Sequence, residues 1–190
     1  ASLSLLLLVR ILGLRLPRTR HDLWLFVVQS IINNVFPFTL MMYGQSKVAS
    51  GLAAVLNATT PLFALLAARL IGGEAMTINR ALGVTCGLAG VAMLVGPELG
   101  ATNLESLLGM GSLLLAALFY GTSALWMRRL AHIDPVVSAA SQLSVSSVIL
   151  FPIAAAVDRF WLLPWPGLPV VGAVLGFAAL STALAYIVFF

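Results

Sequence analysis

The stretch SLLGMGSLLLAALFYGTSALWM, residues 106–127, decides the fold class of this chain. It contains no Lys, Arg, Asp or Glu, and it stands between Glu105 and the pair Arg128-Arg129. A helix of about 20 apolar residues is long enough to cross the roughly 30 Å hydrocarbon core of a bilayer. A charged side chain at the bilayer centre costs roughly 2.5–3.5 kcal/mol on insertion scales, so charges collect where apolar runs end. The stretch therefore predicts a transmembrane helix.

The rest of the chain repeats this pattern. The same length criterion predicts further spans at 23–43, 50–71, 81–97, 136–157 and 167–190. Only 8% of the residues are charged, whereas a soluble domain has about a quarter. Residues 1–14 are also apolar, but too few of them precede Arg10 to cross a bilayer. We therefore predict an all-α, polytopic membrane helical bundle of about six transmembrane helices, preceded by the truncated end of another.

The basic residues predict how the spans are oriented. Eight of the ten fall on one side of the predicted membrane: Arg10, Arg15, Arg18, Arg20, Arg69, Arg80, Arg128 and Arg129. Lys47 and Arg159 fall on the other side. Because cytoplasmic loops are enriched in Lys and Arg, we expect a multi-pass protein of the cell (inner) membrane whose basic loops are cytoplasmic. These loops are Arg10–His21, Arg69–Arg80 and Arg128–Asp134.

Composition also limits the partners. The isoelectric point near 10.0 reflects this orientation and an attraction to anionic membrane lipids. A nucleic-acid partner is not expected, because the arginines are spread over three short loops without an aromatic platform. Cys86 is the single cysteine, and the two histidines, His21 and His132, lie in loops. We therefore expect no intrachain disulfide, no metal site and no cofactor.

Two spans share a short pattern. Residues Ile32–Phe38 and Leu180–Tyr186 both read apolar, two polar, two apolar, small, aromatic. They lie in spans that are five apart, so equivalent helices would cross the membrane in opposite directions. That is the arrangement of an inverted-topology repeat, in which the substrate site lies near the bilayer midplane between the halves. A chance match is the competing explanation.

Longer stretches resemble a known family. They are Ile32-Asn33-Asn34 with Pro37-Phe38, Ala49–Ala54, Leu56–Leu62, Gly73-Glu74, Arg80, Gly83, Gly87, Gly90-Val91, Ala116–Gly121 before Arg128-Arg129, and Leu180–Tyr186. In order and spacing they resemble the EamA-like branch of the drug/metabolite transporter superfamily. The resemblance implies ten helices in two inverted five-helix repeats with both termini cytoplasmic. The chain would run from the end of helix 2 into helix 8, without helices 1, 9 and 10.

On that register the chain divides into three parts. Residues 1–97 would be the C-terminal part of the first repeat, 98–105 an inter-repeat periplasmic loop, and 106–190 the N-terminal part of the second repeat.

Uncharged polar residues inside the spans are the candidates for a substrate pathway, because polar groups in lipid must find partners or line water. Gln29 and Asn33 are four residues apart and share a helix face, whereas Asn34 is turned about 100° away. Pro61 lacks a backbone N–H, so it frees the carbonyl of Asn57 four residues earlier. The full set is Asn33, Asn34, Asn57, Thr60, Pro61, Tyr120, Ser123, Gln142, Thr182 and Tyr186. The competing interpretation is that these groups bond neighbouring helices or bend their own.

Small residues predict helix packing. Gly83, Gly87 and Gly90 give the GxxxG spacing, extended by one turn, which favours close helix contact in an apolar helix. The same interpretation is favoured for the serines of the fifth span, Ser138, Ser141, Ser144, Ser146 and Ser147. In the loop after the second span, Glu74 and Arg80 are expected to pair or to cap helix ends.

Charged residues are absent from the interior of every predicted span. A residue that couples transport to protons would therefore lie in the missing helices or not exist. The same absence argues against an intramembrane hydrolase, which needs a base beside its nucleophile or a metal. We predict an integral membrane transporter of small organic solutes that works by alternating access, with efflux of metabolites, amino-acid-like compounds or drugs as the family-typical activity. The alternatives are a membrane-embedded enzyme acting on lipids and a helical scaffold without a pathway. Substrate, direction, ion coupling and oligomeric state stay open.

Overall fold

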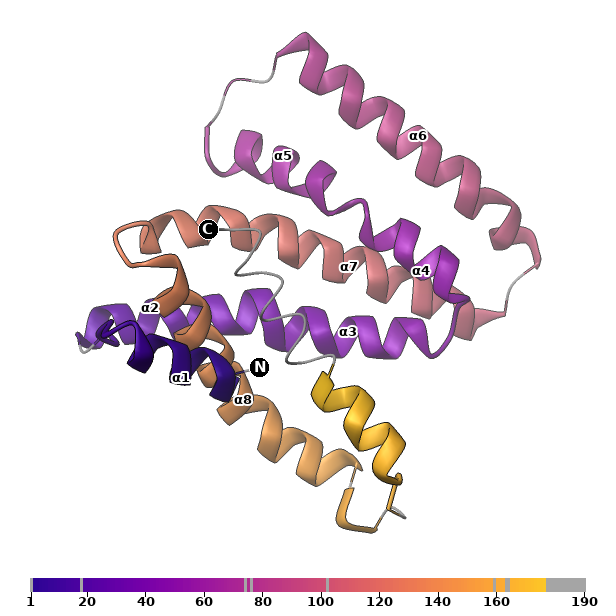
Figure 1. Ribbon diagram of the computed structural model, residues 1–190. Helices are drawn as coiled ribbons and strands as arrows, with labels where there is room; N and C mark the ends of the chain where they lie inside the picture. Colours follow the sequence, from indigo (N-terminus) through magenta and orange to yellow (C-terminus); the bar gives the residue numbers. More distant parts are fainter. Residues whose placement is uncertain are drawn as a thin grey trace. The chain divides into compact units, whose positions relative to one another are not determined.

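The computed structural model describes residues 2–17, 19–73, 75, 77–101, 103–158, 160–162 and 165–176. Every regular element in these ranges is a helix (Figure 1). The chain divides into two compact units. The terminal unit comprises residues 1–30 and 132–190, and the central unit comprises residues 31–131.

The terminal unit is built on one long helix. This helix, α8 (Pro135–Asp158), packs against α1 (Ser2–Ile11) and α2 (Arg20–Ser30). A short 3-10 turn, Phe160–Leu162, and a helix over 168–176 follow α8. The apolar core between α1 and α8 consists of Leu5, Val9, Val136, Val137 and Ala140. The two faces fit because each presents small or branched residues one helical turn apart.

Helices α2 and α8 begin at the same end of the terminal unit. Thr19 caps α2: its Oγ1 accepts a hydrogen bond from the backbone N–H of Asp22 at 3.1 Å. The carboxylate of Asp22 lies 3.4 Å from Nε2 of His132, just before α8. Further along both helices, Ser30 Oγ donates to the carbonyl of Gln142 at 2.9 Å. The two helices therefore run in the same direction, as predicted for the first and fifth spans.

The central unit is organised around α7. Its elements are η1 (Ile31–Val35, a π-helix), α3 (Phe36–Gln45), α4 (Ser50–Asn57), α5 (Thr60–Leu70), α6 (Ile78–Ala101), α7 (Leu104–Met127) and the 3-10 turn η2 (Arg128–Leu130). Helix α7 packs against α3, α4 and α5, and α6 packs against α5 (Figure 1).

Helices α3 and α7 are antiparallel. The end of α3 meets the beginning of α7, where Nζ of Lys47 lies 2.9 Å from Oε2 of Glu105. The beginning of α3 meets the second half of α7, where the rings of Phe36 and Phe119 stack with centroids 5.2 Å apart. Helix α3 belongs to the first predicted span and α7 to the fourth. Spans three apart must run in opposite directions if each span crosses opposite to the one before, so this orientation agrees with the predicted order.

An all-α membrane bundle is confirmed, and four of the six predicted spans correspond to described helices of spanning length. Within the described residues, four helices are long and apolar enough to cross a membrane: Arg20–Gln45, Ser50–Leu70, Leu104–Leu130 and Pro135–Val157. Helix α6 extends beyond residue 97 to Ala101, so the predicted inter-repeat loop 98–105 is partly helical. Residues 177–190 lie outside the described part of the chain, and so does the second copy of the predicted repeat.

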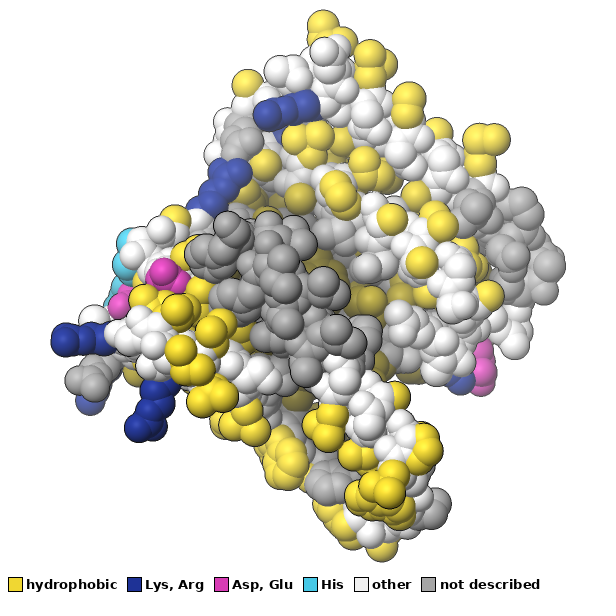
Figure 2. All heavy atoms as spheres, in the orientation of Figure 1, with side chains coloured by type: hydrophobic (Ala, Val, Ile, Leu, Met, Phe, Trp, Pro, Cys, Tyr) yellow, Lys and Arg dark blue, Asp and Glu magenta, His cyan; other side chains and the backbone are white. Residues whose placement is uncertain are grey.

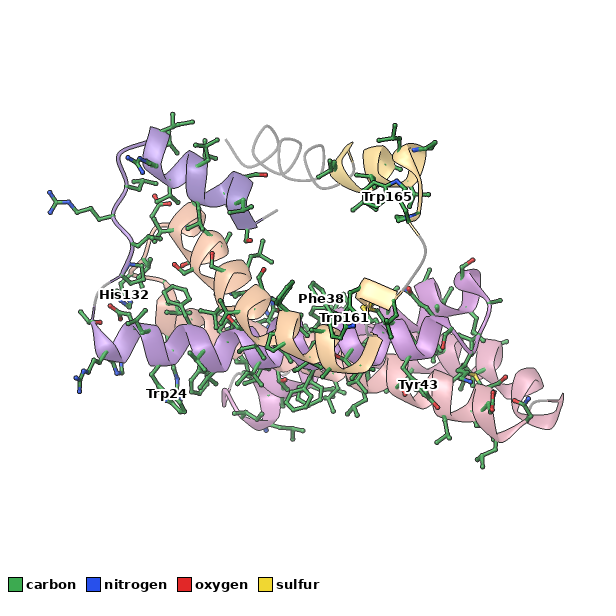
Figure 3. The ribbon with its side chains drawn as sticks, turned by 90° about the horizontal axis from the view of Figure 1, so that it is seen from below. Trp24, Phe38, Tyr43, His132, Trp161 and Trp165 are labelled. Atoms are coloured by element: carbon green, nitrogen blue, oxygen red, sulfur yellow. The ribbon has the colours of Figure 1, made fainter. Side chains whose placement is uncertain are left out.

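The surface of these helices is apolar, as a lipid-facing surface is. Figure 2 shows hydrophobic side chains along the visible surface of α6. Large exposed side chains include Leu70, Met93 and Val148. Trp24 projects from α2 and is 62% exposed (Figure 3). In a soluble protein such surfaces would mark aggregation sites, whereas here they are the expected contact with acyl chains.

Candidate functional site

A π-helical segment in the middle of the first span carries two of the predicted pathway residues. The segment η1, Ile31–Val35, contains Asn33 and Asn34 and lies midway along the helix Arg20–Gln45. A π-helix bonds i to i+5 instead of i to i+4, which widens the helix locally, and such segments occur frequently at functional sites. The two amides therefore lie where the backbone departs from regular α geometry.

These amides belong to a hydrogen-bonded cluster with α7. Asn33 Nδ2 donates to Asn34 Oδ1 at 3.3 Å, and Ser123 Oγ donates to Asn33 Oδ1 at 2.7 Å. The Ser123 hydroxyl also lies 2.7 Å from the carbonyl of Tyr120. Because a hydroxyl carries one hydrogen, these two acceptors compete for it. Asn34 is 4% exposed and Ser123 is 3% exposed, so the cluster lies inside the central unit.

Aromatic residues lie next to this cluster in sequence on both helices. Phe36 directly follows η1, and Phe119 directly precedes Tyr120. The two phenylalanine rings are nearly parallel, with an interplanar angle of 13°. Tyr120 is half-buried. The structure thus brings Asn33, Asn34, Ser123 and Tyr120 together at the interface between the first and fourth spans.

The second span is broken at the predicted proline. Helix α4 ends at Asn57 and α5 begins at Thr60, with Pro61 in the first turn of α5. Pro61 has no backbone N–H to donate to the carbonyl of Asn57. That carbonyl instead accepts a hydrogen bond from Thr60 Oγ1 at 2.7 Å. The freed carbonyl is therefore satisfied within its own helix. By contrast, Oδ1 of the Asn57 side chain is buried without a hydrogen-bond partner in the described structure.

A second polar cluster lies between α2 and α8 in the terminal unit. Gln142 is 6% exposed, and its carbonyl accepts the hydroxyl of Ser30. Three further oxygens are buried without a hydrogen-bond partner among the described residues: Gln29 Oε1, Ser138 Oγ and Ser141 Oγ. Sequence reasoning assigned Ser138 and Ser141 to packing and missed this property.

The other serines of α8 show what is unusual about Ser138 and Ser141. A serine inside a helix commonly donates to the carbonyl four residues earlier. In α8, Ser144, Ser146 and Ser147 do so, at 2.7, 2.7 and 2.8 Å. Ser138 and Ser141 do not. No spacing in the sequence separates the two groups, since all five serines sit on one apolar helix.

The other predicted residues are placed as follows. Thr182 and Tyr186 lie outside the described residues, as does Glu74. Of the three glycines, Gly87 makes a close contact: a Cβ built on it would lie 2.7 Å from the Leu62 side chain of α5. A Cβ built on Gly83 or on Gly90 would have no neighbouring atom within 4 Å.

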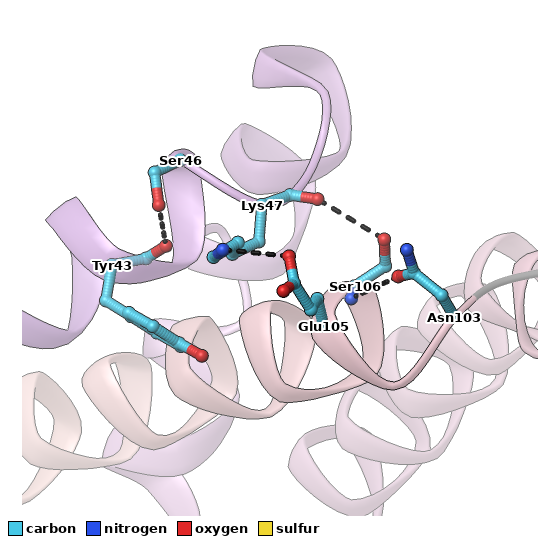
Figure 4. Close-up of polar contacts among 6 residues, drawn as sticks. All are labelled: Tyr43, Ser46, Lys47, Asn103, Glu105 and Ser106. Carbon is cyan, nitrogen blue, oxygen red and sulfur yellow. Dashed lines mark hydrogen bonds and ion pairs between the residues drawn. The ribbon is translucent and has the colours of Figure 1, made fainter.

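A polar clamp joins the α3–α4 turn to α7 (Figure 4). Besides the ion pair with Glu105, the carbonyl of Lys47 accepts a hydrogen bond from Ser106 Oγ at 3.3 Å. Asn103 caps α7 by accepting from the backbone N–H of Ser106 at 3.0 Å. The hydrogen bond to Glu105 raises the pKa of Lys47. Within the described residues no group of His, Cys, Asp and Glu is suited to hold a metal ion.

Comparison with known proteins agrees with this architecture. Residues 1–96 match the EamA-like transporter family. The chain is 25% identical over 190 residues to the uncharacterized transporter YoaV of Bacillus subtilis (strain 168), a match that covers the whole chain and 65% of YoaV. It is 26% identical over 192 residues to the uncharacterized transporter YvbV of the same organism, a match that covers 99% of the chain and 60% of YvbV. No solved structure matches the chain.

The chain thus spans less than two thirds of the length of these two relatives. The family and both names point to a transporter rather than an enzyme. Together with helices long and apolar enough to cross a membrane, they identify a multi-pass membrane protein. The chain belongs to the EamA-like transporter family.

Proposed function

We propose that the protein moves small neutral or zwitterionic organic solutes across the membrane by alternating access, and that the Asn33–Asn34–Ser123 cluster contacts the solute. The observation that carries the proposal is the π-helical turn at Asn33 and Asn34 in the middle of the first span. Uncharged hydrogen-bonding groups at this depth suit a solute without net charge, because binding then leaves no unpaired ion in the membrane.

The π-helical turn also supplies a place for movement. It begins at Ile31, and the boundary between the two compact units falls between Ser30 and Ile31. Sharp changes of helix direction occur at π-bulges, where the regular bonding ladder is interrupted. In the proposed mechanism the helix bends at η1 as the solute site opens to one side of the membrane and then to the other.

The pathway includes further residues by the same reasoning. Asn57 has a buried side-chain oxygen without a described partner, and Tyr120 is half-buried beside Ser123. Gln142 belongs to the proposed pathway within the terminal unit, and Thr182 and Tyr186 stay candidates from the sequence. The partners in this proposal are a small-molecule solute and membrane lipids.

The direct test is solute uptake by the full-length protein in proteoliposomes against a panel of amino acids, metabolites and drugs. We expect Asn34→Ala and Asn57→Ala to reduce uptake of a transported solute at least tenfold. Ser112→Ala is the matched control, because its exposed hydroxyl bonds only to its own helix, at the carbonyl of Leu108. Unchanged uptake in both asparagine variants, with wild-type amounts of folded protein, would show that the site is elsewhere.

The proposed location is the cell (inner) membrane with the basic loops in the cytoplasm. Single cysteines at Arg69 and Arg129, in a Cys86→Ser background, test this orientation. Both are expected to react with a membrane-impermeant reagent only after the membrane is opened, whereas a cysteine at Lys47 is expected to react from outside. Labelling of Arg69 and Arg129 positions from opposite sides would contradict the topology.

A further inference from the structure

We propose that α1 and the segment after it bind an anionic phospholipid. The terminal unit contains a pocket of about 640 Å³ at this place. Its walls include Leu3, Leu7, Arg10, Leu14, Arg15 and Leu16. The pocket is therefore apolar along one side and carries two guanidinium groups.

The apolar wall comes from one face of α1. Leu3, Leu7 and Arg10 follow each other at spacings of four and three, which places them on one side of a helix. Leu3 is 80% exposed and Leu7 is 60% exposed. The opposite face, with Leu5 and Val9, is buried against α8. One side of α1 is thus an apolar stripe without a described partner helix, and the stripe ends at a positive charge.

The second wall is fixed by the turn that ends α1. The backbone N–H of Gly13 donates to the carbonyl of Arg10 at 3.2 Å, and that of Leu14 donates to the carbonyl of Val9 at 3.0 Å. Gly13 has a φ of 66°. These are the features of a Schellman motif, in which a glycine in the left-handed conformation reverses the chain. Because the chain reverses there, residues 14–16 form the second wall of the pocket, and Arg15 joins Arg10 in its lining.

The positive charge in the pocket is not balanced by the described residues. Arg10 and Arg15 are exposed, and neither forms an ion pair with an acid in the described part of the chain. In the terminal unit, Asp22 is engaged by Thr19 and His132, and Asp134 accepts the backbone N–H of Val136. Two arginines that line one pocket are suited to a phosphate group, because a guanidinium can bind a phosphate with two parallel hydrogen bonds.

The occupant that fits both walls is a lipid. A soluble phosphate would contact only the arginines, and the exposed leucines of α1 would have no apolar partner. An anionic phospholipid uses both, with its phosphate at Arg10 and Arg15 and an acyl chain along Leu3 and Leu7. Basic residues at the end of an apolar helix lie at headgroup level, where anionic lipids are concentrated.

The test is lipid binding to the full-length protein, measured by native mass spectrometry with phosphatidylglycerol and, separately, phosphatidylcholine. We expect selective binding of phosphatidylglycerol. Because one arginine near an anionic surface contributes about fivefold in affinity, Arg10→Gln and Arg15→Gln should each weaken binding about fivefold. Arg69→Gln is the matched control, since it removes the same charge from an exposed helix end outside the pocket.

A second comparison distinguishes a lipid from a soluble anion. Leu7→Gln should weaken phosphatidylglycerol binding while leaving any binding of glycerol phosphate unchanged. The proposal is overturned if glycerol phosphate displaces phosphatidylglycerol at equal concentration, which would show a soluble-anion site. It is also overturned if Arg10→Gln, Arg15→Gln and Arg69→Gln bind phosphatidylglycerol alike, as they would if the rest of the transporter covers the pocket. None of these measurements depends on transport.

Discussion

The hydroxyl of Ser123 donates a hydrogen bond of 2.7 Å to Oδ1 of Asn33, 90 residues earlier in the chain. The bond joins the fourth span to the π-helical turn of the first. It continues the antiparallel register set by the Lys47–Glu105 ion pair at one end and the Phe36–Phe119 stack further along. A polar contact therefore fixes the side-chain direction of an amide that the proposed function places against the solute.

Ser123→Ala removes this bond. An ordinary hydrogen bond contributes about 1 kcal/mol to stability, so we expect a loss of that size in thermal unfolding of the detergent-solubilised protein. Uptake should fall further than stability explains, because Asn33 loses the group that orients it. Ser112→Ala on the same helix, whose hydroxyl bonds only to Leu108, should change neither quantity. Equal uptake in the two variants would mean that the Ser123–Asn33 bond is only structural.

The break in the second span gives a prediction about the hydrogen bond to the backbone carbonyl of Asn57. Thr60→Val removes the donor that reaches the carbonyl of Asn57, which leaves a half-buried acceptor inside an apolar span unsatisfied. Such a group costs about 1–3 kcal/mol. In a Pro61→Ala background the residue 61 N–H returns and donates to the same carbonyl, so Thr60→Val should cost much less there. A double-mutant cycle from unfolding curves measures the difference. An equal cost in both backgrounds would show that Thr60 does not compensate for the proline.

Pro61 also shows where sequence reasoning was sufficient and where it stopped. A proline removes a specific donor, so the freed carbonyl of Asn57 was predictable from the sequence. The hydrogen bond from the Thr60 hydroxyl to this carbonyl was not predictable, because a threonine hydroxyl has several carbonyls within reach. The same holds at Asn33 and Asn34. Their polarity and depth were visible, but the helical spacing used to place them assumes regular α geometry, which the π-helical turn of η1 does not have.

The partnerless serines of α8 give a prediction of opposite sign to that for Ser123. Ser138→Ala deletes a buried hydroxyl that has no hydrogen-bond partner in the described structure. Its removal should leave stability unchanged or raise it by about 1 kcal/mol, because a desolvated and unpaired group is lost. Ser146→Ala, which deletes a hydroxyl bonded to the Gln142 carbonyl at 2.7 Å, should lower stability slightly. If Ser138→Ala is the more destabilising of the two, Ser138 has a partner in the full-length protein.

Glycines mark a further limit of the sequence. The GxxxG spacing singled out Gly83, Gly87 and Gly90, yet a close contact forms at Gly87 and not at the other two. Among the glycines of the central unit, a Cβ would meet its nearest neighbours most closely at Gly44, on α3, and at Gly121, on α7. Gly44 packs against Gly109 of α7, and Gly121 packs against α5. None of these glycines is four residues from another, so the GxxxG spacing does not find them.

Gly121 provides the sharpest test of this packing. A Cβ on Gly121 would lie 2.6 Å from the backbone nitrogen of Ala64 and 2.8 Å from the carbonyl carbon of Phe63, both on α5. Backbone atoms cannot move aside as a side chain can, so α5 and α7 must separate along the contact. Overpacking of this kind costs about 1–3 kcal/mol, and we expect Gly121→Ala to lower the midpoint of thermal unfolding accordingly.

Gly111→Ala is the matched control for this variant. It lies on the same helix, is exposed, and has nothing within 4 Å of the position of a new Cβ. Alanine in a helix interior is favoured over glycine by about 0.5–1 kcal/mol, so this variant should unfold at an equal or higher temperature than the parent protein. Because the two substitutions are chemically identical, a difference between them measures the α5–α7 contact itself. Equal midpoints would show that these helices do not approach each other closely at Gly121.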